Sequence, residues 1–469
     1  MLKTEVADSL KEQILKGKIA VGSSLPSLRE ITDDYDVSLS TALAAYEILE
    51  DLGFLEKRFK SKPRARIPEQ FHIPVPDLIL NKPARGEVQN LDLIDWVYTA
   101  SRQPGMSPFG LGLPSPHLFP KNAIKQAIQK ALTKNYDQLF HYLFVPGHPE
   151  LLTLLAKFLR PDTGPVSPSE IILTDGCLEG INRALETITE PGDLVAIESP
   201  TYFGTIQALQ RRGLKVVEIP TKPCIGMDTY HLEMVLKKEK PKLLIATSRV
   251  QNPLGFTIPE ENLREILNLT YKYNVPLLED DIYGPLDETS GKHPTFKSLD
   301  KEGSVIYCSS FSKTIAPGLR LGWIIPGKFY DTIRKQKLSS NTAVNSLAQL
   351  TMIELLKKGD IREHFEQTMN KISFQRQQYQ QALACHLPEG FKVSRPNGGY
   401  MLWIEGPANF DSVAFLEDCL KQKISITPGP VFSASKNFKN CFRLNAGFPL
   451  QGESQKHLEK LCQRLKAYI

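Results

Sequence analysis

A single lysine after a short apolar run constrains this chain more than any other feature of its sequence. Residues 305–307 predict a buried strand, and hydroxyl side chains, Lys313, a Pro-Gly pair and Arg320 follow it before a second apolar run. A lysine in such a place suits covalent chemistry with a carbonyl compound, and nearby hydroxyls with an arginine suit a bound phosphate. The stretch therefore predicts a functional site rather than a segment of core.

This stretch, S-S-F-S-K-T-I-A-P-G-L-R-L-G-W at residues 309–323, resembles the cofactor-lysine segment of the fold-type I pyridoxal 5′-phosphate (PLP) enzymes, the aspartate aminotransferase superfamily. The resemblance implies that PLP is the cofactor and that Lys313 forms the aldimine with it. It also implies that the phosphate of PLP is bound by Ser310, Ser312 and Arg320.

A second motif of this superfamily stands upstream, as L-L-E-D-D-I-Y-G at residues 277–284. The resemblance implies that Asp280 pairs with the pyridinium nitrogen and that Tyr283 contacts the ring hydroxyl, with Asp281 as the alternative aspartate. An anionic carboxylate there keeps the ring nitrogen protonated, which makes the ring an electron sink. Lys313, Asp280 and Tyr283 are thus the predicted catalytic residues.

Three more segments match the superfamily in the same order. Q-N-P-L-G resembles the N-P-x-G turn whose asparagine, here Asn252, hydrogen-bonds the ring hydroxyl, and P-T-Y resembles the P-x-Y motif whose tyrosine, here Tyr202, stacks on the ring. Residues 171–180 predict a strand, a glycine and a helix start, and the N–H groups of a helix N-terminus bind phosphate. By the resemblance these phosphate contacts come from Gly176, Cys177 and Leu178.

Two further matches concern a second subunit and a substrate. H-Y-L-F-V-P-G resembles Y-x-x-x-x-G, where the tyrosine, here Tyr142, reaches the phosphate bound by the neighbouring subunit, so the resemblance implies a homodimer. F-R-L-N places Arg443 where the superfamily binds a substrate carboxylate. A guanidinium suits that role because it pairs bidentately with a planar carboxylate.

Composition excludes several classes of protein. At 469 residues, 41% hydrophobic and 23% charged, the chain is typical of globular proteins with more than one domain. No apolar run approaches the ~18 residues of a membrane span and the N-terminus does not resemble a signal peptide, so we expect a cytoplasmic protein. Seven cysteines without C-x-x-C spacing indicate reduced thiols and no structural metal.

Alternating strands and helices predict the fold of the larger part of the chain. They indicate an α/β domain over residues 106–469, with the mainly parallel, seven-stranded-type sheet of fold-type I PLP-dependent transferases and helices on both faces. A smaller α+β subdomain is expected over about 387–469, with strands at 400–404 and 441–445. Residues 67–105 are rich in proline and predict a linker that contains a short helix.

Residues 1–66 predict a different kind of unit, with three helices and a hairpin in the order of a winged helix-turn-helix. The segments L-P-S-L-R, V-S-L-S-T and L-E-D-L-G-F-L resemble the GntR family of bacterial DNA-binding domains. Two features depart from that family: Leu39 stands where an arginine is usual, and the wing has no glycine. The resemblance implies DNA contacts by Arg29, Ser38, Ser40 and Thr41.

The charge of this unit is unevenly distributed. Residues 1–56 carry eleven acids and five bases, whereas residues 57–66 carry six bases and no acid. A basic wing favours contact with DNA phosphates, and a solvated linker is the alternative interpretation. The predicted phosphate contacts include Lys57, Arg58 and Lys60.

Together the two halves resemble the MocR-type bacterial regulators, in which a GntR winged helix is joined to a PLP-binding aminotransferase-like domain. The first hypothesis is a transcription regulator that binds double-stranded DNA and senses PLP, or an amine or amino acid, through the Lys313 aldimine. The second is an aminotransferase with a vestigial DNA-binding head. The third is a PLP-dependent decarboxylase or lyase of the same fold.

Overall fold

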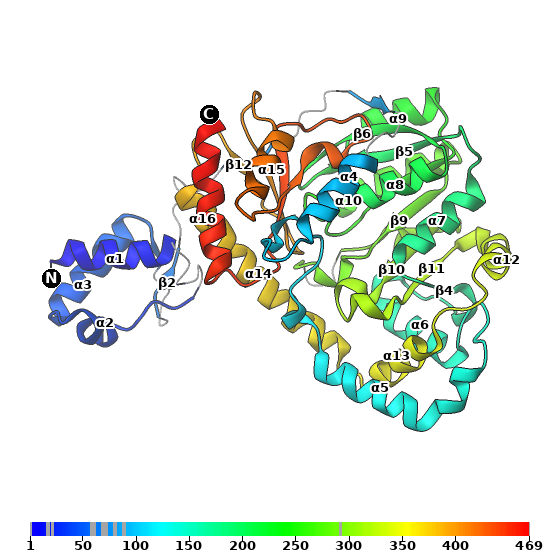
Figure 1. The fold of residues 1–469 in the computed structure, drawn as a ribbon, viewed down its shortest axis with the longest axis horizontal. Coiled ribbons are helices and arrows are strands. Elements are labelled where there is room, and N and C mark those ends of the chain that lie inside the picture. The colour runs from blue at the N-terminus through cyan, green and yellow to red at the C-terminus, as the bar shows by residue number, and fades with distance from the viewer. Residues whose placement is uncertain are drawn as a thin grey trace.

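A computed structural model describes residues 2–15, 19, 23–56, 62–66, 74–77, 82–86, 91–289 and 293–468 of the chain. A small N-terminal helical unit stands beside a much larger α/β body, and the C-terminal helix α16 (Glu453–Leu465) lies on the side of the body that faces this unit (Figure 1). In the described part of the chain, no helix has both the length and the apolar character needed to cross a membrane.

The N-terminal unit is a winged helix-turn-helix, as predicted. Helices α1 (Lys3–Leu15), α2 (Leu28–Tyr35) and α3 (Leu39–Asp51) precede an antiparallel pair, β1 (Leu55–Glu56) and β2 (Arg64–Ala65). Ser27 and Ser38 cap α2 and α3, because each hydroxyl accepts a hydrogen bond from a backbone N–H of the first turn. The core is formed by fully buried side chains, among them Val6, Leu10, Ile14, Ile31, Leu49 and Phe54.

The body is built on one large sheet with the strand order β3-β6-β5-β8-β9-β10-β11-β4, and β7 (Gly226–Met227) pairs with β6. Neighbouring strands from β6 to β10 are parallel, and β10 to β11 and β11 to β4 are antiparallel. The seven strands predicted for this fold are β6 (Lys215–Lys222), β5 (Leu194–Ser199), β8 (Leu243–Ala246), β9 (Leu277–Asp280), β10 (Val305–Ser310), β11 (Gly322–Ile325) and β4 (Ile172–Thr174).

Helices cover both faces of this sheet, because its strands are apolar on both sides. Residues of one face pack with α7, α8 and α12, and those of the other pack with α9 and α10. A third cluster joins α5, α6 and α13 below the β4 edge. The helices of the body up to this point are α5 (Lys121–Asn135), α6 (Pro149–Thr163), α7 (Cys177–Ile188), α8 (Phe203–Arg211), α9 (Thr229–Lys238), α10 (Glu260–Lys272), α11 (Phe296–Leu299), α12 (Tyr330–Ser340) and α13 (Ser346–Lys358).

The smaller C-terminal subdomain has an antiparallel sheet of order β12-β13-β15-β14. The long helix α14 (Ile361–His386) leads into it, and α15 (Ser412–Leu420) and α16 pack on it. Its strands are β12 (Lys392–Val393), β13 (Met401–Glu405), β14 (Thr427–Pro428) and β15 (Cys441–Asn445).

Two elements inside the range predicted as a linker pack on the body. Strand β3 (Ala84–Gly86) pairs with β6 at the edge of the large sheet, and α4 (Leu91–Ser101) buries Ile94 and Val97 in the main core. The local sequence does not indicate this packing, because it depends on partners more than a hundred residues away. The domain boundaries themselves stay a prediction.

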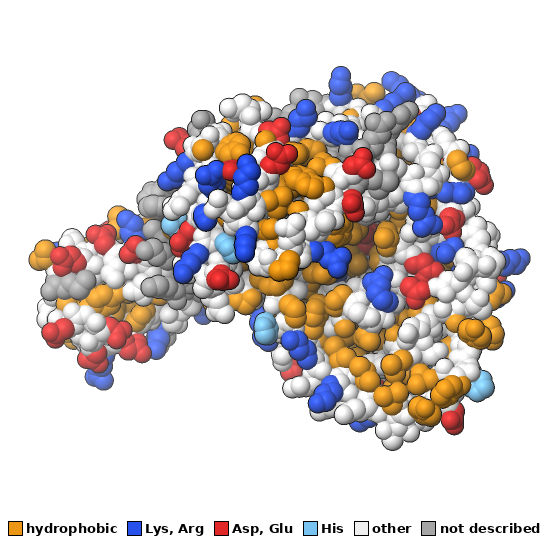
Figure 2. Space-filling view, viewed as in Figure 1, with side chains coloured by type: hydrophobic (Ala, Val, Ile, Leu, Met, Phe, Trp, Pro, Cys, Tyr) orange, Lys and Arg blue, Asp and Glu red, His pale blue; other side chains and the backbone are white. Residues whose placement is uncertain are grey.

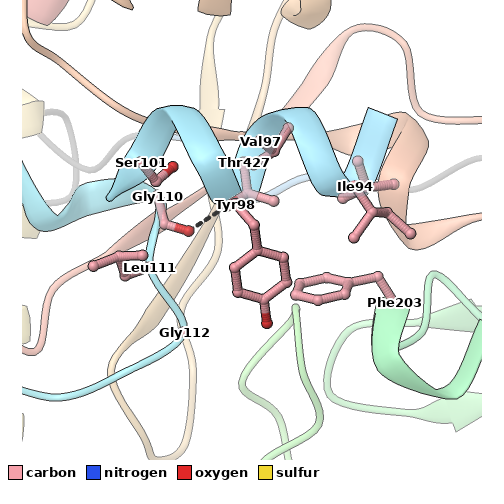
Figure 3. A pocket seen from close by; sticks show the side chains of 10 residues that line it. Ile94, Val97, Tyr98, Ser101, Gly110, Leu111, Gly112, Phe203 and Thr427 are labelled. Atoms are coloured by element: carbon pink, nitrogen blue, oxygen red, sulfur yellow. Dashed lines mark hydrogen bonds between the residues drawn. The ribbon is translucent and has the colours of Figure 1, made fainter. Parts of the chain in front are cut away.

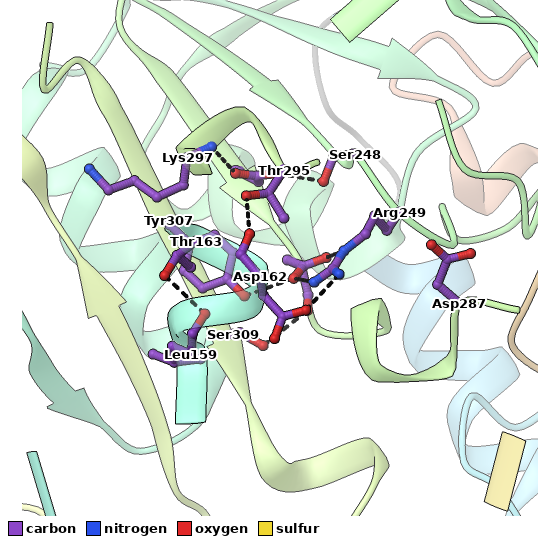
Figure 4. Close-up of polar contacts among 12 residues, drawn as sticks. Leu159, Asp162, Thr163, Ser248, Arg249, Asp287, Thr295, Lys297, Tyr307 and Ser309 are labelled. Atoms are coloured by element: carbon purple, nitrogen blue, oxygen red, sulfur yellow. Dashed lines mark hydrogen bonds and ion pairs between the residues drawn. The ribbon is translucent and has the colours of Figure 1, made fainter. Parts of the chain in front are cut away.

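A buried polar network ties several of these elements together (Figure 4). Arg249, which follows β8, donates to both carboxylate oxygens of Asp281 after β9, and its Nη1 lies 2.8 Å from Asp162 Oδ1 on α6. Tyr307 Oη on β10 donates to Asp281 Oδ2 at 2.7 Å. Burial raises the pKa of Asp281, and the Arg249 guanidinium opposes that shift.

Arg249→Met should destabilise the body by about 3–5 kcal/mol, because it leaves the buried carboxylate of Asp281 without its cation. Arg85→Ala is the matched control. Its ion pair with Glu239 is solvent-exposed on the arginine side, so the expected loss is at most about 1 kcal/mol. Urea unfolding of the full chain measures both, and similar small losses for the two variants would contradict the assigned role of Arg249.

Candidate active site and DNA-binding head

The candidate active site lies where five strands of the large sheet end together. Strands β4, β5, β8, β9 and β10 run in the same direction, so the loops after them meet at one edge of the sheet. Between these loops is a cavity of about 160 Å³. It is lined by Cys177, Leu178, Ile181, Tyr202, Thr247, Asn252, Asp280, Ile282, Tyr283, Ser312, Lys313 and Arg320.

Lys313 enters this cavity from the short helix η7 (Phe311–Lys313), directly after β10. Its Nζ donates to Gly112 O at 2.8 Å and lies 5.8 Å from the ring centroid of Tyr283. Burial lowers the pKa of Lys313 to about 8, and the positive charge of Arg443 acts in the same direction. The amine is therefore much closer to its neutral, nucleophilic form at neutral pH than an exposed lysine is.

Asp280 and Asp281 point in different directions, which distinguishes the two aspartates that the sequence left open. Asp280 lines the cavity, whereas Asp281 is held by Arg249 and Tyr307 outside it. Asp280 Oδ1 accepts from Cys177 Sγ at 3.3 Å and from Ile282 N at 3.2 Å. Burial raises the pKa of Asp280 to about 6.

Arg320, Ser312 and the start of α7 form one wall suited to an anion. Arg320 Nη1 lies 3.4 Å from Ser312 Oγ, and its Nη2 donates to Asp175 O at 2.6 Å. Gly176 is required here, because it has φ of +92° and a Cβ atom would lie 2.6 Å from Arg320 Nη2. A guanidinium, a hydroxyl and a helix N-terminus together suit a phosphate group.

Other predicted cofactor residues take three kinds of position. Tyr202, Asn252 and Tyr283 line the cavity. Ser310 is not among the lining residues, and its Oγ accepts from Ser312 N at 3.3 Å. Tyr142 lies outside the cavity and 73% of it is exposed.

Arg443 is a buried cation on β15, and only 1% of it is exposed. Its guanidinium donates to Asn252 Oδ1 at 3.1 Å, to Gly110 O at 3.1 Å and to Thr427 Oγ1 at 3.2 Å. Burial lowers the pKa of Arg443. In the described part of the chain its Nε has no hydrogen-bond partner, and no carboxylate forms an ion pair with it.

Beside Arg443 is a second, small cavity of about 10 Å³ that the sequence did not indicate (Figure 3). Tyr98 on α4 meets the ring of Phe203 edge-on, with the ring centroids 5.4 Å apart, and Thr427 Oγ1 donates to Gly110 O at 2.7 Å. The sequence predicted this short helix but placed it in the linker, so its packing on the core was missed. The aromatic and apolar spacing of that helix was the available signal.

The DNA-binding residues predicted in the head divide into described and undescribed ones. Arg29 is exposed on α2. Ser38 caps α3, and its Oγ lies 2.8 Å from both Ser40 Oγ and Thr41 Oγ1. Three predicted phosphate contacts lie outside the described residues: Lys57, Arg58 and Lys60.

Comparison with known proteins gives two family matches and close relatives of nearly the same length. Residues 113–465 match aminotransferase class I and II, and residues 2–61 match the bacterial regulatory proteins of the gntR family. The uncharacterized HTH-type transcriptional regulator YdcR of Escherichia coli is 33% identical over 98% of this chain and 98% of its own.

Two further similarities join the regulators to the enzymes. The probable rhizopine catabolism regulatory protein MocR of Rhizobium meliloti is 25% identical over 85% of this chain and 80% of its own. The crystal structure of Pyrococcus horikoshii kynurenine aminotransferase has a TM-score of 0.76 and 28% identity, and covers 81% of this chain and 95% of its own. The chain therefore belongs to the MocR-type transcriptional regulators, in which a gntR-family winged helix precedes a domain of the aminotransferase class I and II family.

Proposed function

We propose that this regulator binds PLP through Lys313 and that an amino acid reaching the same cavity changes how its head binds DNA. The observation that carries the proposal is the meeting of Lys313, Asp280 and the phosphate-type wall in one cavity, with buried Arg443 nearby. The same chain carries a gntR-family head. A sensing role for the cavity connects these two facts.

The residues around the cavity fit PLP in each part of the molecule. Lys313 would hold it covalently, Asp280 would pair with its ring nitrogen, and Tyr202 would lie against the ring. Asn252 and Tyr283 would contact the ring hydroxyl. The phosphate would be held by Gly176, Cys177, Leu178, Ser312 and Arg320, and Ser310 accepts a hydrogen bond from the backbone of Ser312. When bound, PLP supplies an electron-accepting ring to an attached amine.

Arg443 is the proposed receptor for the carboxylate of the effector. A buried guanidinium without a carboxylate partner in the described part of the chain is costly, and a bound carboxylate would offset that cost. Its contact with Asn252 supports this role, because Asn252 also lines the PLP cavity. An α-amino acid carries both an amine for the cofactor and a carboxylate for Arg443.

We also propose a homodimer in which Tyr142 reaches the phosphate of the neighbouring subunit. Tyr142 belongs to an exposed apolar patch, and hydrophobic side chains gather on the face of the body that holds α5 and α13 (Figure 2). Large exposed patches of this kind are typical of protein interfaces. A dimer would present two heads to two DNA half-sites. The patch includes Tyr136, Phe140, Tyr142 and Phe144, which are 57%, 70%, 73% and 56% exposed.

An aminotransferase with a vestigial head is the second candidate, favoured by the complete set of Lys313, Asp280 and Arg443. The acidic character of the head also favours it, because α2 alone has three exposed acids, Glu30, Asp33 and Asp34. The regulator is preferred because Arg29 and the capped start of α3 are retained. The two candidates differ in whether the bound amino acid turns over or changes DNA affinity.

Covalent attachment of PLP to apo-protein should become faster as pH rises through about 8, because only the neutral amine attacks and burial lowers the pKa of Lys313 to about 8. Borohydride trapping at a series of pH values, followed by peptide mass spectrometry, measures this. Lys313→Ala should lose the trapped label, and Lys328→Ala, at an exposed lysine, should keep it. A trapped label that persists in Lys313→Ala would show that the lysine is wrongly assigned.

An amino acid should change both the absorbance of the holo-protein and its DNA affinity, whereas the matching amine without a carboxylate should act much more weakly. Arg443→Met should abolish the difference and keep PLP bound, because the proposed PLP contacts come from other residues. Absorbance and fluorescence anisotropy on labelled DNA measure the two effects. Turnover at about 1 per second or more, with DNA affinity unchanged, would favour the aminotransferase instead.

Arg29→Ala should reduce the preference for specific over random DNA by about 1–3 kcal/mol, the usual cost of losing a bidentate base contact. The DNA probe is the region next to the protein's own gene. Lys62→Ala, which removes an exposed basic side chain of the wing, is the matched control. It should weaken binding to both kinds of DNA about equally. Equal losses for both DNAs in Arg29→Ala would mean that Arg29 contacts only the backbone.

A further inference from the structure

The composition of α3 limits which bases this helix can recognise. It is the second helix of the helix-turn-helix, so in DNA-bound relatives of this motif it enters the major groove with its N-terminal residues against the bases. Its sequence, L-S-T-A-L-A-A-Y-E-I-L-E-D, contains no arginine, lysine, asparagine, glutamine or histidine. It therefore lacks the side chains that form bidentate hydrogen bonds with guanine or adenine.

The side chains that α3 projects are instead apolar. Leu39 is 58% exposed and Leu43 is 47% exposed, and residues four apart share one face of a helix. The opposite face, which holds Ala42, Ala45 and Leu49, is buried in the core of the head. These two leucines are therefore available on the surface of the head at the first turns of α3.

The hydroxyl groups at the start of α3 are already engaged with one another. Ser38 Oγ accepts from Thr41 N at 3.2 Å as the helix cap, and it lies 2.8 Å from the hydroxyls of Ser40 and Thr41. These hydrogen bonds stabilise the helix start, and the two leucines are exposed beside them. Phosphate contacts would come from basic side chains outside α3, and Lys62, Arg64 and Arg66 of the wing are exposed.

Thymine is the base that presents a methyl group in the major groove, and its usual protein contact is an apolar side chain. We propose that Leu39 and Leu43 recognise thymine methyl groups at adjacent positions of each half-site. The inference rests on the proposed DNA-binding function and adds its base preference. Glu47 is exposed one turn further along the same face. Its carboxylate suits the amino group of cytosine better than it suits any other base edge.

Deoxyuridine substitution tests this contact directly, because uracil keeps the base pairing of thymine and lacks only its methyl group. The full-length holo-protein is titrated onto the DNA fragment from beside its own gene, in which thymines are replaced by deoxyuridine one at a time. One or two replacements per half-site should weaken binding about fourfold each, the effect of losing one buried methyl-sized contact. Fluorescence anisotropy at constant salt measures the affinities.

Leucine variants then assign each methyl group to a side chain. Leu39→Ala and Leu43→Ala should bind the thymine fragment more weakly and should each lose the difference between thymine and uracil at one position. Leu52→Ala is the matched control, since Leu52 is 39% exposed at the opposite end of α3 and should keep the full difference. Thermal unfolding of each variant checks that the head still folds.

The possible outcomes separate this inference from the proposed function. Tight, specific binding that is indifferent to every uracil would overturn the methyl contact and leave the regulator standing. Leucine variants that weaken thymine and uracil fragments equally would also overturn it, and a change in subunit assembly would then identify the leucines as a protein interface. An absence of specific DNA binding by the unsubstituted protein would overturn both proposals.

Discussion

The buried ion pair between Arg249 and Asp281 is the interaction on which the candidate site depends. It joins the loops after β8 and β9, and Tyr307 and Asp162 attach the same carboxylate and guanidinium to β10 and α6. Because Asp281 is turned into this network, the preceding residue, Asp280, is turned into the cavity. The loop after β8 carries both Arg249 and Asn252, so one buried pair orients residues on two walls of the cavity.

The cavity and its surroundings bring positively charged side chains together, and burial removes these charges from water. The charges of Arg443, Arg320 and Asp280 all act on Lys313, and the pKa of Lys313 is lowered while that of Asp280 is raised, in both cases first by burial. Such a site is electrostatically complementary to a phosphate at one end and a carboxylate at the other. The protein without ligands therefore carries an energetic cost that binding would relieve, which is a physical basis for sensing.

Different elements of the head would carry different parts of DNA recognition. Exposed basic side chains of the head include Arg29 on α2 and Lys62, Arg64 and Arg66 of the wing, whereas α3 presents leucines and acids. Phosphate attraction by the wing and base recognition by α2 and α3 would thus come from different elements, so the affinity for any DNA and the preference for one site are separable. A body that changed the spacing of two heads would alter both without touching a base.

The sequence alone determined the features that depend on short stretches of chain. The strand before Lys313, the helix that starts after Gly176 and the order of the motifs depend on neighbouring residues, and the winged helix and the mainly parallel sheet were predicted from such local patterns. Local hydrogen bonding and side-chain periodicity act within a few residues, so a sequence expresses them directly.

Only the tertiary structure decided which distant groups meet. It separated Asp280 from Asp281 through Arg249, turned the Cys177 thiol to Asp280, and placed Gly112 O against Lys313. It also showed that α4, which was expected within a linker, packs on the core beside Arg443. These outcomes depend on burial and on contacts between residues that are tens to hundreds of positions apart in the sequence. No local pattern encodes the free energy of such contacts.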